Sequence, residues 1–315
     1  GFLITIIVCK HSPSQPFSLW VFYTARVSRI IPALYALILV LTVLGYFLLI
    51  PEYYQKFARN AVASLGFFSN YRYAGESTGY FDLAAEENIL LHTWSLSVEW
   101  LFYLMFPIVL LPFLRYKTGV KWVLGLMFVL SLVYASYLLH TNAKGAFYFL
   151  SSRVWEMALG GLVAVYPLSL DQAKSRLCAV LGWGCLLVAV VLYDGTTPWP
   201  AYYALLPTVG TACVIAAHAE GRYLQIKGIQ LVGKYSYSIY LWHWPVVFYS
   251  VYFVSITDFD FFKELAIGLS VVLGALSYHM VEQPSARWAR KHSQVKVMVT
   301  SMLAVLALVG MLKVI

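Results

Sequence analysis

Long apolar runs separated by short polar segments dominate this sequence. Nine of the runs are long enough to cross a bilayer, because a spanning helix needs about 20 mostly apolar residues. They cover residues 31–50, 95–114, 120–139, 147–166, 177–193, 202–218, 236–255, 263–281 and 296–314. Residues 1–9 are apolar but too short to span, and we expect them to be the remnant of a tenth helix. The pattern predicts an all-α, polytopic transmembrane helix bundle.

The composition supports a membrane protein and argues against a soluble one. Of the 315 residues, 61% are hydrophobic and only 11% are charged, and the mean hydropathy is +0.74. Soluble domains carry about 25% charged residues. The four cysteines lack the spacing of metal ligands, so no metal site is predicted.

The net charge of +8 is explained by membrane topology rather than by nucleic-acid binding. If the segment 10–30 faces the cytoplasm and the spans alternate, most of the 22 basic residues fall on the cytoplasmic side. They gather in residues 10–29, 115–121, 174–176, 222–234 and 287–296. This orientation places the C-terminus outside the cytoplasm, and no nucleic-acid partner is expected.

One connection, residues 51–94, is much longer than the others and faces outside in this topology. Its apolar stretch 61–68 predicts a short interfacial helix, followed by a loop around Asn70, Gly75 and Gly79. Loops of this length inside a compact domain are usually functional. The connection is therefore a candidate part of a functional site.

The segment 92–100 places ionisable groups at the edge of an apolar run. His92 and Glu99 are seven residues apart, which puts them on roughly the same face of a helix. An ionisable group at membrane depth costs about 2.5–3.5 kcal/mol on insertion scales, so such groups usually serve a function. His92 could act as a general base or orient one, and Glu99 could hold a histidine or pair with an arginine. The alternatives are an interfacial histidine and a structural ion pair. Trp94 fits an interfacial aromatic belt or a stacking surface for a sugar ring.

Two arginines stand three positions apart before the first complete span. Arg26 and Arg29 would be neighbours on a helix and could clamp phosphate groups as planar forks. Positive-inside anchoring is the alternative. Pro32 fits the first turn of the span that follows.

A further pair lies within the span 147–166. Arg153 and Glu156 can pair locally at i and i+3, and Gly160 and Gly161 permit close helix packing. A structural pair and a substrate contact are both open for Arg153 and Glu156.

The remaining candidate residues, His243 and Glu282, lie in the predicted spans 236–255 and at the end of 263–281. His243 lies inside a span and is followed by Pro245, which frees a backbone carbonyl. A satisfied core histidine is the alternative for this residue. Glu282, at the inner end of the next span, is the natural partner of a basic group such as Arg26, Arg29 or His243.

Taken together, these segments resemble the motifs of the acyltransferase-3 family of bacterial integral-membrane O-acyltransferases. Residues 1–5 are similar to the end of an S-G-F-L-I-T element, and residues 22–32 follow the pattern F-Y-x-x-R-x-x-R-I-x-P. Residues 92–99 match H-T-W-S-L-S-V-E, and residues 237–245 and 281–284 match two late motifs. The resemblance covers essentially the whole chain, with the motifs in order.

The resemblance implies transfer of an acyl group, expected to be acetyl, from cytoplasmic acyl-CoA to a hydroxyl of an extracytoplasmic carbohydrate. That carbohydrate would be O-antigen of lipopolysaccharide, an exopolysaccharide or peptidoglycan. The implied location is the bacterial inner membrane, and the implied co-substrate is acetyl-CoA, with its phosphates on Arg26 and Arg29. Candidate catalytic residues are His92 and Glu99 in the outer half of the site and His243 and Glu282 in the inner half. Candidate substrate-binding residues are Trp94, Arg153 and Glu156.

The resemblance also implies that part of the family's domain precedes this sequence. The family's first helix, with a basic residue and a histidine proposed to act in catalysis, is absent before Gly1. We therefore expect residues 1–294 to be an N-terminally truncated acyltransferase-3-like transmembrane domain, residues 295–315 to be an additional C-terminal span, and this chain to be inactive alone. His92 and Glu99 would then position and polarise rather than perform the first chemical step. An SGNH-type extracytoplasmic domain, fused or separate, is an expected partner.

Two other function classes are compatible with ionisable residues in the membrane. A transporter of a sugar or lipid-linked intermediate commonly has paired repeats, which we do not find in this sequence. A membrane scaffold or sensor would not need an arginine pair at a CoA-facing surface. An acyl-transfer assay on the wild type and on an Arg26→Ala/Arg29→Ala variant distinguishes the enzyme from both.

Overall fold

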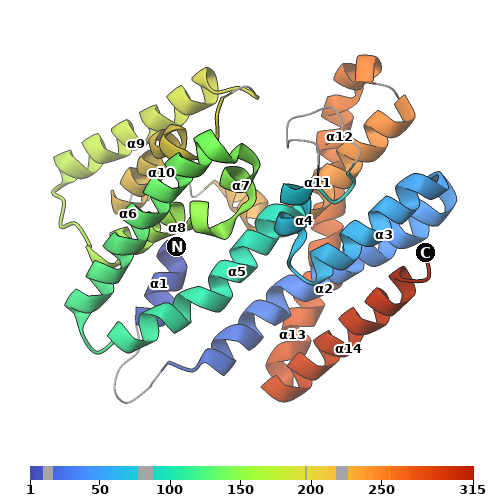
Figure 1. The fold of residues 1–315 in the computed structure, drawn as a ribbon, viewed down its shortest axis with the longest axis horizontal. Helices are drawn as coiled ribbons and strands as arrows, with labels where there is room; N and C mark the ends of the chain where they lie inside the picture. Colours follow the sequence, from blue (N-terminus) through green and yellow to red (C-terminus); the bar gives the residue numbers. More distant parts are fainter. Residues whose placement is uncertain (10–16, 77–87, 196, 218–225, 255) are drawn as a thin grey trace. The chain divides into compact units, whose positions relative to one another are not determined.

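The computed structural model of the protein, drawn in Figure 1, describes residues 1–9, 17–76, 88–195, 197–217, 226–254 and 256–315. The regular elements in these ranges are all helices, as the hydrophobic pattern predicts. The chain divides into two compact units. The first comprises Gly1–Phe17 and Val98–Leu224, and the second comprises Ser18–Ser97 and Gln225–Ile315. Helix α5 (Thr93–Leu110) begins in the second unit and continues in the first.

The first unit is built from paired helices. Helix α8 (Val154–Val165) packs on both α1 (Phe2–Cys9) and α6 (Lys117–Thr141), and α9 (Gln172–Leu192) pairs with α10 (Leu205–Ala216), as Figure 1 shows. The short elements between them are η2 (Leu111–Phe113), α7 (Ala143–Tyr148), η3 (Leu150–Ser152) and η4 (Ala201–Ala204). A Cβ added to Gly160 would lie 2.9 Å from the backbone nitrogen of Phe2, and one added to Gly161 would lie 2.8 Å from Oγ1 of Thr5. The close packing predicted at these two glycines is therefore confirmed.

The second unit carries the polar groups of interest. It contains α2 (Leu19–Leu48), α3 (Pro51–Leu65), α4 (Ser69–Gly75), α11 (Lys227–Val254), α12 (Ile256–Ser277), α13 (Gln283–Lys291) and α14 (Gln294–Leu312). A five-residue π-helical turn, Tyr278–Glu282, joins α12 to α13. Helices α11 and α12 form one antiparallel pair, and α14 packs along α2 and α3.

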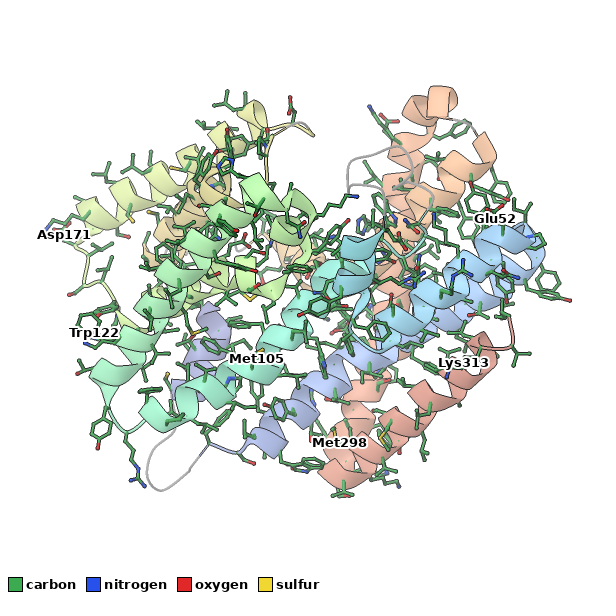
Figure 2. The ribbon with its side chains drawn as sticks, in the orientation of Figure 1. Glu52, Met105, Trp122, Asp171, Met298 and Lys313 are labelled. Atoms are coloured by element: carbon green, nitrogen blue, oxygen red, sulfur yellow. The ribbon has the colours of Figure 1, made fainter. Side chains whose placement is uncertain are left out.

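Six helices in the described residues are long and apolar enough to cross a membrane. Their spans are Leu19–Leu48, Thr93–Phe113, Thr118–Thr141, Gln172–Leu192, Phe262–Lys291 and Gln294–Leu312. Apolar side chains remain exposed on them, as expected where lipid covers a protein. Met105 and Trp122, labelled in Figure 2, are 56% and 76% exposed. The chain is a multi-pass membrane protein.

The predicted count of nine spans is not confirmed. The run 147–166 is divided among α7, η3 and α8, and the run 202–218 is divided between η4 and α10, so that each leaves only a short apolar helix. Helix α11 is long enough to span, but its many tyrosine, tryptophan and histidine side chains lower its hydropathy.

Two local predictions are also corrected. Helix α2 begins twelve positions before residue 31, at Leu19, where Oγ of Ser18 accepts a hydrogen bond from the backbone nitrogen of Val21 at 3.4 Å. Pro32 therefore lies inside the helix rather than in its first turn. In the long connection, α3 is longer than the predicted 61–68 helix, and Asn70 and Gly75 belong to α4 rather than to a loop. Gly79 lies outside the described residues.

Candidate active site

His92 lies in the turn directly before α5 and is 2% exposed. Both of its ring nitrogens are buried and have no hydrogen-bond partner among the described residues. Buried polar atoms are normally hydrogen-bonded, and a neutral imidazole offers one donor and one acceptor. The ring therefore has unused capacity to bind a polar ligand.

Tyr240 on α11 holds the backbone beside this ring. Its hydroxyl donates a hydrogen bond to the carbonyl oxygen of His92 and lies 2.7 Å from Oγ of Ser95. The rings of Tyr240 and His92 are 5.3 Å apart between centroids, with an interplanar angle of 65°. These contacts join segments 148 residues apart in the sequence and fix the turn that carries His92 against α11.

His243 follows Tyr240 by one turn of α11 and meets the same histidine. The centroids of the His92 and His243 rings are 5.5 Å apart, with an interplanar angle of 75°. Nδ1 of His243 lies 2.6 Å from the carbonyl oxygen of Tyr240, in its own helix. The structure thus brings together two histidines that the sequence predicts in opposite halves of the site.

The electrostatic surroundings of His92 favour the neutral ring. Burial lowers the pKa of His92 well below its ordinary value, and the nearby His243 lowers it further. The backbone at Leu241 favours the protonated form, but it makes no hydrogen bond of normal geometry with the ring nitrogens. At neutral pH, His92 therefore keeps one ring nitrogen as an acceptor.

A set of buried hydroxyl groups lies beside the His92 turn and was not predicted from the sequence. Oγ of Ser64 and Oγ1 of Thr93 are 2.7 Å apart, and Oγ of Ser69 and Oγ of Ser97 are also 2.7 Å apart. These bonds tie α3 and α4 to the first turn of α5. The only sequence signal for this set was the presence of serine and threonine in the predicted helices. A buried serine or threonine cannot be distinguished in sequence from an exposed one.

Two asparagines continue this buried network toward α11. Nδ2 of Asn60 donates to Oδ1 of Asn88 at 3.0 Å, and the carbonyl oxygen of Asn88 accepts a hydrogen bond from Nε1 of Trp244 at 2.8 Å. Nε of Arg72 donates to Oδ1 of Asn60 at 2.5 Å. A continuous series of hydrogen bonds therefore runs from Arg72 to the residue next to His243.

Glu282 lies in the π-helical turn, an irregularity that is frequent at functional sites. Its Oε2 accepts a hydrogen bond from Oγ of Ser238 at 2.9 Å, and its carboxylate interacts electrostatically with Arg29. The hydroxyl of Tyr237 donates to the carbonyl oxygen of Ile30 at 2.8 Å, which holds α11 against α2. Arg29 is one of the three partners that the sequence suggests for Glu282.

A cavity of about 630 Å³ opens beside this carboxylate and is called here the arginine-lined cavity. The residues that line it include Arg29, Arg287 and Arg290, with Glu282 as the acidic residue of the lining. In the sequence, Arg287 and Arg290 belong to the basic segment 287–296 and indicate only membrane topology. Because arginines outnumber acidic residues in this lining, the cavity suits a ligand that carries phosphate groups.

Helix α11 carries His243 and contacts one residue of the arginine-lined cavity, Glu282, without lining the cavity itself. Ser238, which holds Glu282 at the cavity wall, precedes His243 by five positions. At 1.5 Å per residue, this places them about 7.5 Å apart along the helix axis. One rigid element therefore positions both polar groups.

Two other candidates in the second unit lie elsewhere. The guanidinium of Arg26 lies 5.5 Å from the centroid of the Phe22 ring, and Arg26 is not part of the cavity lining. Trp94 is only 7% exposed, so its ring belongs to the core at the start of α5 rather than to an open stacking surface.

A family model described as an acyltransferase domain matches residues 1–280 of the chain. The chain belongs to the acyltransferase-3 family.

Several curated proteins are similar to most of this member of the family. O-acetyltransferase OatA of Staphylococcus aureus is 28% identical over 307 residues, which cover 90% of this chain and 50% of the relative. Peptidoglycan O-acetyltransferase OatA of Listeria monocytogenes is 26% identical over 306 residues, which cover 90% of this chain and 49% of the relative. An uncharacterized protein of Haemophilus influenzae is 31% identical over 233 residues, which cover 68% of this chain and 93% of the relative. The chain spans about half the length of the two OatA relatives. No solved structure matches it.

The remaining three candidates belong to the first unit of this acyltransferase domain. Glu99 on α5 is exposed and accepts a hydrogen bond from the hydroxyl of Tyr103. His92 precedes α5, so the helical spacing from which a shared face with Glu99 was predicted does not apply to this pair, and a role of Glu99 in the site stays a prediction.

Arg153 and Glu156 form the local pair that their spacing predicts. Nε of Arg153 lies 3.5 Å from Oε2 of Glu156, and the two side chains are 15% and 21% exposed. The guanidinium also lies 5.7 Å from the centroid of the Phe147 ring. The pair is a structural feature of the first unit, and a role in substrate binding stays a prediction.

Proposed function

We propose that this protein is an integral membrane O-acyltransferase of the bacterial inner membrane, with its C-terminus outside the cytoplasm. It transfers an acyl group, acetyl in our proposal, from cytoplasmic acetyl-CoA to a hydroxyl of an extracytoplasmic carbohydrate. Family membership and the two O-acetyltransferase relatives support this activity. Peptidoglycan is the acceptor we favour, because one relative is named a peptidoglycan O-acetyltransferase.

The observation that carries the proposal is that α11 contacts two unlike polar features, the His92 turn through Tyr240 and Glu282 of the arginine-lined cavity through Ser238. One is a buried, neutral histidine with unfilled hydrogen-bonding capacity, and the other is a cavity with three arginines. Acyl transfer from CoA to a hydroxyl needs both a phosphate-binding surface and a group that orients the hydroxyl.

For the donor, we assign the phosphates of CoA to Arg29, Arg287 and Arg290. Guanidinium groups bind phosphate oxygens through parallel, charge-assisted hydrogen bonds. Glu282 lines this cavity and accepts a hydrogen bond from Ser238 on α11, the helix that also carries His243. Arg26, on the neighbouring turn of α2, is a supporting cation in this proposal.

For the acceptor, we assign the orienting group to His92, with His243 and Tyr240 holding it in place. A ring nitrogen of His92 accepts a hydrogen bond from the attacking hydroxyl. The hydroxyl oxygen forms a bond to the acyl carbon, the carbon–sulfur bond of the thioester breaks, and the hydroxyl proton ends on the CoA sulfur. An SGNH-type extracytoplasmic domain, fused or separate, would complete delivery to the glycan.

The test measures transfer of labelled acetyl from acetyl-CoA to peptidoglycan fragments by the protein in its natural length, reconstituted in nanodiscs. We expect Arg29→Gln and Arg287→Gln each to raise the KM for acetyl-CoA about tenfold, since each removes a charge-assisted contact worth about 1.5–3 kcal/mol. Lys227→Gln, a basic residue on α11 outside the cavity lining, is the matched control and should leave this KM unchanged.

Three outcomes would count against the proposal. An unchanged KM for acetyl-CoA in both arginine variants would remove the donor assignment. Uptake of labelled sugar or lipid-linked saccharide without acyl transfer would favour the transporter. Transfer by the 315-residue chain alone would contradict the expectation that it is inactive by itself.

A further inference from the structure

A second basic cavity lies in the second unit, between α3, the start of α4 and the end of α14. Its volume is about 490 Å³, and its lining includes Arg59, Arg72 and Lys313. The described residues of this lining carry no acidic side chain. We call it the outer basic cavity, after the predicted topology.

The two basic cavities lie at opposite ends of one membrane-length helix. Gln294, the first residue of α14, lines the arginine-lined cavity, and Lys313, directly after its last residue, lines the outer basic cavity. The 19 residues of α14 rise about 28 Å at 1.5 Å per residue. The hydrocarbon core of a bilayer is about 30 Å thick, so the cavities face opposite sides of the membrane.

Two of the three basic side chains in this lining can contact an anionic ligand without breaking an existing ion pair. Arg72 is already engaged, since its Nε lies 3.7 Å from Oε1 of Glu76 and also donates to Asn60. Arg59 and Lys313 are exposed and form no ion pair with any described residue. An anion entering the cavity would therefore meet at least one full positive charge from each of two helices.

Most of the remaining lining is apolar. Ala58, Val62, Leu312 and Ile315 border the cavity, with Gln55 as a further polar residue, and Phe68, which also lines it, is 46% exposed. Helix α3 itself is amphipathic and follows a span directly, which is typical of a helix lying in the membrane interface. Basic pockets at the ends of membrane helices bind the phosphate headgroups of lipids, whose chains lie on the adjacent apolar surface.

From this combination we propose that the outer basic cavity binds the phosphate headgroup of a membrane amphiphile, with Arg59 and Lys313 as its main contacts. Two sources share this chemistry: an anionic phospholipid and a saccharide carried on a lipid diphosphate. The hydrogen bonds from Arg72 through Asn60 and Asn88 to Trp244 connect the occupied cavity to the histidine pair. The proposal does not depend on acyl transfer, because its test measures binding alone.

The test uses the natural-length protein in nanodiscs of zwitterionic phosphatidylcholine. Native mass spectrometry or fluorescence titration measures binding of three probes: phosphatidylglycerol, a polyprenyl-diphosphate-linked disaccharide, and uncharged diacylglycerol. We expect at least one phosphate probe to bind, with affinity falling as salt is raised, and diacylglycerol to bind much more weakly. The double variant Arg59→Gln/Lys313→Gln should weaken phosphate binding at least tenfold.

The matched control replaces one lysine on each of the same two helices outside the cavity, as Lys56→Gln/Lys296→Gln, and should bind the probes within about twofold of the wild type. Loss of phosphatidylglycerol binding in the cavity variant would identify a phospholipid site, and loss of the diphosphate-linked probe would identify a lipid-linked saccharide site. Equal binding by the two double variants, or by phosphate probes and diacylglycerol, would overturn the proposal. Thermal melting of both variants verifies that they are folded.

Discussion

The Arg153–Glu156 pair of the first unit and the His92–His243 pair of the second unit both place polar side chains among apolar helices, but they are compensated differently. Arg153 and Glu156 bear opposite charges, lie one turn apart, and offset each other at 3.5 Å. His92 is surrounded by Tyr240 and His243 but makes no hydrogen bond through its ring to the described residues. The charges of Arg153 and Glu156 offset each other, whereas the ring of His92 can still bind a ligand.

This difference separates polar groups that hold a membrane fold together from groups that act on a substrate. When a buried charge pairs with an opposite charge nearby in the sequence, the free-energy cost of burying it is reduced and no ligand is needed. A buried neutral histidine whose ring nitrogens form no hydrogen bond of normal geometry with the described residues has no such compensation, so its burial needs another explanation. The distinction is not complete, because both residues of the Arg153–Glu156 pair also contribute a buried polar atom, Nη1 and Oε1, to those without a hydrogen bond of normal geometry among the described residues.

Replacing His92 should have the largest effect. We expect His92→Gln to lower kcat for acetyl transfer by about 10²- to 10⁴-fold, the usual contribution of a positioned acid–base group, while the protein keeps its thermal stability. The measurement is single-turnover transfer from labelled acetyl-CoA.

His140→Gln supplies the matched control, since His140 is an exposed histidine on α6 in the first unit. It should transfer acetyl at the wild-type rate. Equal rates for the two variants would show that the unfilled nitrogens of His92 have no part in the reaction.

Breaking the ion pair of the first unit should instead act on stability. Arg153→Gln or Glu156→Gln leaves one largely buried charge without its partner, so each should lower the free energy of unfolding by about 3–5 kcal/mol. Arg153→Met/Glu156→Met should restore most of this loss, because apolar residues of similar size replace both charges. Thermal melting in nanodiscs measures all three variants.

The acceptor KM of the double methionine variant then decides between the two roles of the pair. A restored melting temperature with a strongly raised acceptor KM would make Arg153 and Glu156 substrate-binding residues and would erase the contrast with His92. A melting temperature that stays low in the double variant would show that the two charges do more than neutralise each other.

The sequence predicted those features that depend on local spacing. Hydrophobic run length predicted the six helices that are long and apolar enough to span, although not the count of nine, and the i, i+3 spacing of Arg153 and Glu156 predicted their pairing, because both follow from helix geometry alone. The seven-residue spacing of His92 and Glu99 did not predict their relation, because such spacing is informative only within a helix. His92 lies in the turn before α5.

Features that depend on long-range packing could not be predicted in this way. His92 and His243 meet only because Tyr240 ties α11 to the turn before α5, across 148 residues. Arg287 and Arg290 fit the positive-inside pattern equally well whether they face water or line a cavity. The buried Asn60–Asn88 bond likewise has no local signature, since each asparagine alone is typical of an exposed turn.

The packing that supports the histidine pair can be tested through two glycines of α12. A Cβ on Gly274 would lie 2.7 Å from both the backbone nitrogen and Cα of Ile239, in the helix that carries Tyr240 and His243, whereas a Cβ on Gly268 would have no neighbour within 4 Å. Gly274→Ala should therefore lower the free energy of unfolding by about 1–3 kcal/mol through overpacking. Gly268→Ala, its matched control, should be neutral or stabilising by up to about 1 kcal/mol.

Acyl transfer adds a second readout for the same two variants. If α11 positions the histidines, Gly274→Ala should also slow transfer at temperatures where the protein is folded, and Gly268→Ala should not. A destabilised Gly274→Ala protein with a normal transfer rate would mean that the histidine pair tolerates movement of its helix.

The smallest expected effect is the response to pH, and it tests whether the His92 ring is neutral. Because the pKa of His92 is lowered in the folded protein, the unfolded chain binds a proton near the ordinary value of about 6.5 that the folded chain does not bind. This contribution to stability is constant above that pH and falls as the pH drops below it, by at most about 1.4 kcal/mol per pH unit. Transfer, which needs the neutral ring, should persist below pH 6.5. In His243→Gln the neighbour that further lowers the pKa is lost, so the acidic limit of any remaining transfer should move upward; an unchanged limit would place the titrating group elsewhere.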